Sequence, residues 1–171
     1  CRCGAQSDDW RDGLMVHTIS ALVENHFGVL TRVAGLFASR GYNIQSLTVG
    51  PTEDETVSRM TIVVEGDDKI IDQVKKQLNK LIDTIKVIDL TGEDFVDREL
   101  LLIKVSASSK TRPDILQLTE VFKGSVVDIA PAVVTIEVSG NPKKIDAFIA
   151  MLKPYGVREM ARTGRIALGR G

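Results

Sequence analysis

Apolar side chains recur along residues 14–90 with two spacings, one typical of strands and one typical of helices. Four segments rich in β-branched and aliphatic residues predict strands: 14–24, 44–49, 60–64 and 85–90. Apolar residues at intervals of three and four predict one helix after the first strand and one after the third: Leu30, Val33, Ala34 and Phe37, and then Ile71, Val74, Leu78 and Leu81. Residues 14–90 are therefore expected to fold in the order strand, helix, strand, strand, helix, strand.

The same order returns after an acidic, turn-rich segment at 92–98, which is predicted to be a linker. Strands are expected at 100–105, 126–129, 133–138 and 157–160. Two further helices are predicted by apolar residues on one helical face: Ile115, Leu118 and Phe122, and then Ile145, Phe148, Ile149 and Leu152. The last residues, 161–171, contain several arginines and are expected to form a basic tail.

Two βαββαβ units imply an α+β fold made of two ferredoxin-like sandwiches, each an antiparallel sheet with helices on one face. The expected domains are a flexible N-terminal arm at 1–13, an N-terminal domain at 14–91, the linker at 92–98 and a C-terminal domain at 99–171. Units this small bury a modest share of their surface and leave sheet edges that can pair. We therefore expect a homodimer or a higher homo-oligomer.

The composition is that of a globular protein, with 43% apolar and 26% charged residues. A formal net charge of −1 gives no bulk attraction to nucleic acid or anionic lipid, and no apolar run is long enough to span a membrane. RNA-recognition motifs share this strand order, but the strand at 59–64 lacks the aromatic residues on which bases stack. Neither nucleic acid nor a membrane is expected as a partner.

Enzyme signatures are nearly absent from the sequence. It has no nucleophile elbow, no Walker-type phosphate loop and no dinucleotide fingerprint, so no catalytic residue is predicted. Cys1 and Cys3 supply at most two thiolates, whereas a closed structural zinc site needs four ligands. The consecutive acids of 53–55 diverge and fit a solvated turn better than a cation site. No metal site is predicted, and His17, inside a strand, is expected to be a packed or edge histidine.

The most informative segment is the junction between the first strand and the first helix. Gly28 lies where the helix begins, so a ligand can approach unpaired first-turn N–H groups that favour a carboxylate. Asn25 and, further along, Asn43 offer amides, while Phe27, Val29 and Leu30 offer apolar surface. His26 either touches a ligand or is simply solvated. These residues suggest a pocket for a small zwitterion with an aliphatic side chain; the alternative is an ordinary helix cap with a turn glycine.

Several motifs in the right order resemble the regulatory (small) subunit of acetohydroxyacid synthase, also called acetolactate synthase. They are Asn25–Leu30, Arg40–Val49, Ser58–Ile62, Arg98–Val105, Val127–Ile129 and Ala161–Arg165. The resemblance extends from Leu14 to the end of the chain. It implies an N-terminal ACT domain, which is a βαββαβ module that binds amino acids, followed by a smaller ferredoxin-like domain.

The resemblance also implies a function. Such a subunit does no chemistry itself; it binds the large catalytic subunit, raises its activity and confers feedback inhibition by branched-chain amino acids, chiefly valine, in valine, leucine and isoleucine biosynthesis. The catalytic subunit would carry thiamine diphosphate, Mg²⁺ and FAD, with no cofactor on this chain. ACT domains of this type pair side by side and hold effectors at the dimer interface.

Site residues follow from the same resemblance. Asn25 and Gly28 match the effector loop of the family, and Asn43 matches an amide that reaches across the interface. The neighbouring wall residues are Val29, Leu30 and Ile44, while His26 and Phe27 stand where the family varies.

Two other functions remain open from the sequence. The chain could be a stand-alone amino-acid sensor of the ACT type without a synthase partner, or an enzyme in its own right, which the missing catalytic motifs argue against. The expected location is a bacterial cytoplasm, with a plastid as the alternative.

Overall fold

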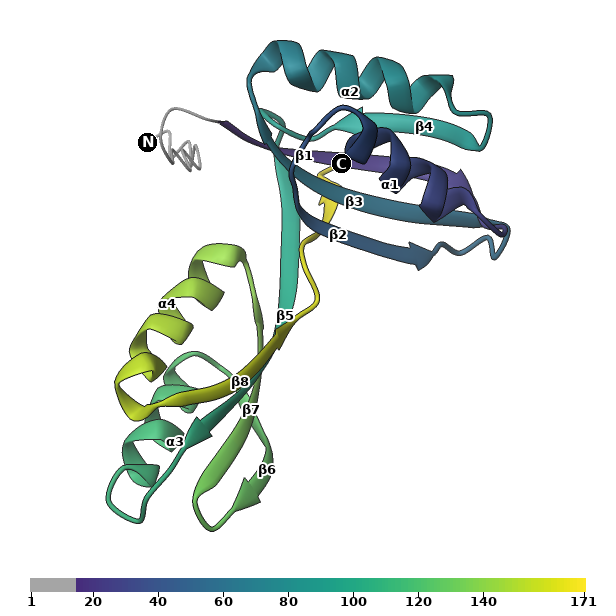
Figure 1. Cartoon of the computed structure of the whole chain (residues 1–171). Coiled ribbons are helices and arrows are strands. Elements are labelled where there is room, and N and C mark those ends of the chain that lie inside the picture. Colours follow the sequence, from purple (N-terminus) through teal and green to yellow (C-terminus); the bar gives the residue numbers. More distant parts are fainter. Residues whose placement is uncertain (1–14) are drawn as a thin grey trace. The chain divides into compact units, whose positions relative to one another are not determined.

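A computed structural model of the 171-residue chain describes residues 15–171. The arm predicted at 1–13, with Cys1 and Cys3, lies outside the described residues. The chain forms two compact units, of which the first extends to Val96 and also includes Ala167–Gly171, and the second comprises Asp97–Ile166 (Figure 1). None of the described helices is long and apolar enough to cross a membrane.

The first unit is a four-stranded antiparallel sheet with two helices on one face (Figure 1). The strands lie in the order β2-β3-β1-β4, so that β2 and β4 are the edges of the sheet. In chain order the elements are β1 (Met15–Glu24), α1 (Val29–Ser39), β2 (Ile44–Pro51), β3 (Val57–Gly66), α2 (Asp68–Lys80) and β4 (Thr84–Asp89). The predicted βαββαβ order is confirmed.

The core of this unit lies between the sheet and the two helices. Ile19 of β1 pairs with Ile62 of β3, and neither side chain is exposed to solvent. Phe37 of α1 and Val74 of α2 belong to the same buried cluster. Apolar residues on one face of each element therefore meet in a single layer, as their spacing in the sequence predicts.

The second unit repeats this plan with its own core. Its sheet has the order β6-β7-β5-β8, and its largest buried side chains include Ile103, Ile136 and Phe148. The elements are β5 (Phe95–Ser106), α3 (Arg112–Val121), β6 (Ser125–Ala130), β7 (Val133–Gly140), α4 (Pro142–Leu152), the 3₁₀ turn η1 (Lys153–Tyr155) and β8 (Val157–Arg162). Together the two units make the α+β fold of two ferredoxin-like sandwiches.

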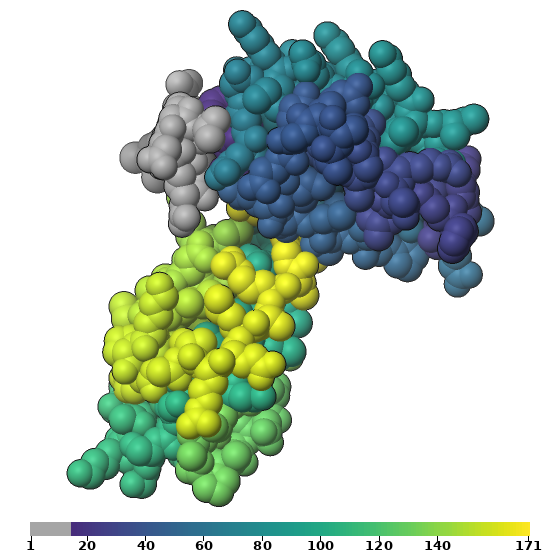
Figure 2. Space-filling view, viewed as in Figure 1, coloured from purple at the N-terminus to yellow at the C-terminus, as the bar shows by residue number. Residues whose placement is uncertain are grey.

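Two segments differ from the expectations drawn from the sequence. Strand β5 begins at Phe95, inside the segment predicted as a linker at 92–98. The segment predicted as a basic tail contains the end of β8 and a further short strand, β9 (Ile166–Gly169), which pairs with β5. Figure 2 shows these C-terminal residues in yellow on the molecular surface.

Ion pairs join the C-terminal segment to acidic residues near the start of β5. Arg162 donates to both carboxylate oxygens of Glu99, at 2.6 and 2.8 Å, and also contacts Asp146. Arg165 lies 3.4 Å from Asp97, and Arg170 lies 3.0 Å from Asp94. Two acids of the predicted linker, Asp94 and Asp97, are thus partners of arginines in the predicted tail, and each segment contains part of a strand.

Candidate effector site

The loop that joins β1 to α1 contains the residues predicted to bind an effector. Gly28 is the N-cap of α1 and has φ 88° and ψ −8°, in the left-handed region that L side chains rarely adopt. A Cβ atom built on Gly28 would meet no other atom within 4 Å. The glycine is therefore required by the backbone, and the space beside it is open to a ligand.

The N-terminus of α1 has no side-chain cap. No side chain of the described residues accepts a hydrogen bond from its first turn, and no acidic residue lies in that turn. Helices α2 and α4 differ, because Asp67 accepts from the Ile70 N–H and Asn141 accepts from the Lys144 N–H. The first-turn N–H groups of α1 lie at the positive end of the helix dipole and would suit a carboxylate.

Asn25 is fixed by the turn that joins β2 to β3. Its backbone N–H donates to the Thr56 carbonyl at 2.7 Å, and its Nδ2 donates to the Glu55 carbonyl at 2.8 Å. Asp54 shapes this turn, because its Oδ1 accepts from the hydroxyl and the backbone N–H of Thr56. These two bonds, the hydroxyl first, lower the pKa of Asp54. The acidic segment is thus a structured turn that supports the loop.

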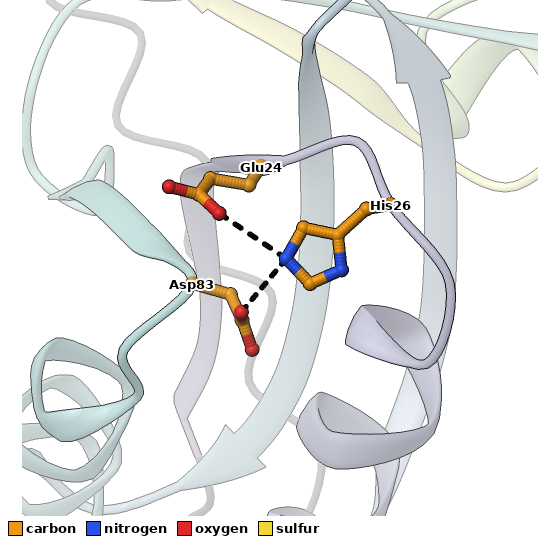
Figure 3. Close-up of side chains that lie close together, drawn as sticks. All are labelled: Glu24, His26 and Asp83. Carbon is orange, nitrogen blue, oxygen red and sulfur yellow. Dashed lines mark hydrogen bonds and ion pairs between the residues drawn. The ribbon is translucent and has the colours of Figure 1, made fainter.

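His26 lies between two carboxylates (Figure 3). Its Nε2 is 2.9 Å from Asp83 Oδ1 and 3.1 Å from Glu24 Oε2, and its Nδ1 is 3.1 Å from the Phe27 carbonyl oxygen. The hydrogen bond to the Phe27 carbonyl raises the pKa of His26, and Asp83 and Glu24 raise it further. Arg32 of α1 also pairs with Asp83.

The apolar residues predicted as pocket walls have three different environments. Phe27 is fully exposed and Leu30 is 47% exposed, so both can meet a ligand at the loop. Val29 is 4% exposed and belongs to the core of the first unit. Its side chain therefore faces the core, away from solvent. Ile44 is half-buried and packs against the same core.

Asn43 and Gly28 lie at opposite ends of α1. This helix has 11 residues, which corresponds to a length of about 16 Å. Asn43 precedes Ile44, which pairs with Val64 near the end of β3, whereas Glu24 pairs with Val57 at the start of β3. A single chain therefore does not bring Asn43 to the loop.

Sequence reasoning missed the carboxylate and arginine partners of His26. Asp83 lies 57 positions after His26 in the chain, and no local motif links the two residues. The strand order offers a signal, because β1 and β4 are antiparallel neighbours and the end of β1 therefore meets the start of β4. The Glu24 N–H indeed donates to the Asp83 carbonyl at 2.9 Å.

The βαββαβ fold of the first unit defines a module of the ACT class. One family model, described as an AHAS small subunit-like ACT domain, matches residues 19–86, and a second, described as the small subunit of acetolactate synthase, matches residues 98–171. The chain belongs to the acetolactate synthase small-subunit family.

Individual relatives agree with this family. The chain is 56% identical over 157 residues to a probable acetolactate synthase small subunit of Archaeoglobus fulgidus, covering 92% of this chain and 98% of that one. It is 45% identical over 158 residues to the acetolactate synthase isozyme 3 small subunit of Salmonella typhimurium, covering 92% and 97%. The crystal structure of the small subunit from Thermotoga maritima superposes with a TM-score of 0.85 at 43% identity, covering 92% and 98%.

Proposed function

We propose that this chain is a non-catalytic subunit that binds the catalytic subunit of acetolactate synthase, raises its activity and makes it sensitive to valine or another branched-chain amino acid. The main support is the N-terminus of α1, where Gly28 leaves open space beside first-turn N–H groups that no described side chain caps. The names of the relatives support a synthase partner.

The loop suits each part of a branched-chain amino acid. The effector carboxylate would accept hydrogen bonds from the first-turn N–H groups of α1. The aliphatic side chain would contact Phe27 and Leu30, which are exposed. An amide oxygen, such as that of Asn43, would accept from the ammonium group.

A dimer would bring Asn43 to the loop. Strand β2 is an edge of the sheet, and a two-fold axis beside it would place the β2 strands of two copies antiparallel. Because antiparallel strands run in opposite directions, the start of β2 in one copy would lie beside the end of β2 in the other. Asn43 of one copy would then approach Gly28 of its partner, and two equivalent sites would form.

Inhibition requires that the effector favours one arrangement of the dimer over another. An effector that binds two arrangements equally shifts nothing, and allosteric couplings are typically about 1–3 kcal/mol. In this proposal the arrangement favoured by valine engages the catalytic subunit differently. Thiamine diphosphate, Mg²⁺ and FAD would belong to that catalytic subunit.

The organisms of the relatives support a proposed location. Those reported above come from bacterial and archaeal species, so we propose a cytoplasmic subunit of such a cell. These relatives give no support to a plastid location.

The decisive experiment is valine inhibition of the synthase reconstituted from this chain and the catalytic subunit. Gly28→Asp is compared with Gly28→Asn, because both side chains strain the same left-handed position and only one carries a charge. We expect Gly28→Asp to raise the valine concentration for half inhibition at least tenfold over Gly28→Asn, through repulsion of the effector carboxylate. Equal sensitivity of the two variants would reject a carboxylate site at this loop.

Asn43→Ala tests the contribution of the partner copy. We expect weaker valine inhibition with activation of the catalytic subunit largely intact, because Asn43 lies away from the described core. Lost activation with normal valine sensitivity would contradict the proposed role. If the chain binds valine in calorimetry but never co-purifies with the catalytic subunit, the stand-alone sensor is the better description.

A further inference from the structure

A histidine and two carboxylates converge at the end of the first unit where β1 meets β4 (Figure 3). Glu24, His26 and Asp83 each offer one ligand atom, and the three atoms lie within 4.8 Å of one another. Metal–ligand bonds of about 2.1 Å place neighbouring ligand atoms about 3.0–3.4 Å apart. The distances from His26 Nε2 to Asp83 and to Glu24, 2.9 and 3.1 Å, are close to this range.

The hydrogen bond at Nδ1 fixes which ring nitrogen of His26 carries the proton and how the ring is oriented. Nδ1 lies 3.1 Å from the Phe27 carbonyl oxygen, which can only accept, so the proton must be on Nδ1. In the neutral ring the lone pair of Nε2 then faces two carboxylate oxygens, which also cannot donate. This arrangement needs a cation at Nε2, and that cation is either a proton or a metal ion.

We propose that Glu24, His26 and Asp83 form a binding site for one divalent transition-metal ion of the Zn²⁺ class. An imidazole with two carboxylates suits such ions better than Mg²⁺ or Ca²⁺, which prefer oxygen ligands alone. Three protein ligands leave at least one position for water or a small ligand. The proposal does not require the effector role of the loop, since the three ligands can be tested without valine.

Neighbouring groups hold the three proposed ligands in place. The side chain of Asp83 is 7% exposed, and Arg32 holds its second oxygen. The hydrogen bond from the Glu24 N–H to the Asp83 carbonyl joins the backbones of the two acidic ligands, and the Phe27 carbonyl orients the imidazole of His26. Such outer contacts typically tune metal affinity by about 10–100-fold. The His26 side chain is 45% exposed, so an ion can reach it from solvent.

Arg32 is the main opposing feature. Its guanidinium contributes a positive charge beside Asp83, so the site as a whole carries about one negative charge rather than two when His26 is neutral. We therefore expect Arg32→Met to strengthen metal binding, whereas loss of any of the three ligands weakens it.

The test uses the full chain with Cys1→Ser and Cys3→Ser, so that thiolates cannot bind the ion. The protein is stripped of metal, and Zn²⁺ is titrated by calorimetry at pH 8, with Co²⁺ absorption as a second readout. We expect one ion per chain, and at least a tenfold loss of affinity in His26→Gln and in Glu24→Gln. Both side chains are about half exposed, so these variants are expected to fold. Glu53→Gln, an exposed acid of the neighbouring turn, is the control and should not change the affinity.

NMR of the histidine rings identifies the ligand directly. Zn²⁺ should shift the ring signals of His26 and leave those of the buried His17 unchanged. The proposal is overturned if the cysteine-free chain binds no ion, if His26→Gln binds as tightly as its parent, or if His26 signals do not respond to saturating Zn²⁺.

Discussion

Hydrogen bonds to a single carboxylate shape the turn that holds Asn25. Asp54 accepts from Thr56 twice, and the carbonyls of the adjacent Glu55 and Thr56 then hold the side chain and the backbone of Asn25. The position of the loop that joins β1 to α1 therefore depends on a turn much later in the chain, because Glu55 lies 30 residues after Asn25.

Thr56→Val should raise the pKa of Asp54 toward its ordinary value, because the hydroxyl is the largest cause of the lowered pKa. A carboxyl whose pKa is lowered by folding stabilises the protein above its ordinary pKa, and this contribution is lost as pH falls through the folded value. The stability difference between Thr56→Val and the parent should therefore be present at pH 7 and vanish in acid. NMR titration of the Asp54 carboxyl carbon and thermal unfolding at several pH values measure both effects.

Thr52→Val is the matched control for that variant. Thr52 also contributes a hydroxyl to this turn, but it bonds the backbone of Asp54 and not the carboxylate. The pKa of Asp54 should change little in Thr52→Val, and a shift as large as that of Thr56→Val would show that turn geometry, rather than the direct bond, lowers the pKa.

At the scale of elements, one arginine links the side chains of the edge strand β8 and its neighbour β5. Arg162 on β8 forms a bidentate ion pair with Glu99, whose side chain is only 6% exposed. Removing the arginine would leave a nearly buried carboxylate without its charged partner. Such a loss is strongly destabilising, while exposed ion pairs contribute little.

Arg162→Met should therefore lower the free energy of unfolding by about 2–3 kcal/mol. Lys104→Met removes a comparable contact from the same pair of strands, but its partner Glu159 is exposed, and we expect almost no change. Urea denaturation followed by circular dichroism compares the two variants. A similar loss of unfolding free energy in both variants would mean that the burial of Glu99 does not explain the effect of Arg162.

The elements that the sequence predicts well are those with a buried face. Ile71, Val74 and Leu78 are spaced as a helical stripe, and all three are in the core. Strand β9 was missed because it is four residues long and depends on β5, a strand from elsewhere in the chain. The loop around Gly28 was predicted from local chemistry, whereas Asp83 was not, because its contact with His26 exists only in the folded sheet.

At the scale of the whole molecule, the chain passes between its two units twice. It leaves the first unit after Val96 and returns to it with Ala167–Gly171. The returning segment contributes the buried Ala167, and its Arg170 N–H donates to the Asp94 carbonyl at 2.9 Å.

A chain that ends at Ile166 should therefore lose protection from amide hydrogen exchange in the first unit. We expect faster amide exchange at residues 90–96, because the truncation removes β9 and its contacts, with little change in strands β6 and β7 of the second unit. Hydrogen exchange with mass spectrometry measures both regions. The variant Arg170→Met removes the ion pair with Asp94 and keeps β9, so it distinguishes the effect of the ion pair from that of the strand. Unchanged exchange at 90–96 would mean that the C-terminal strand does not stabilise that segment.

The separation of Gly28 and Asn43 along α1 has a genetic consequence. In the proposed dimer each site takes its glycine from one copy and its amide from the other, so chains with Gly28→Asp and chains with Asn43→Ala should complement each other. Mixed dimers of these two insensitive chains would hold one site with neither defect and one with both. Co-expression should therefore restore part of the feedback that each variant alone has lost.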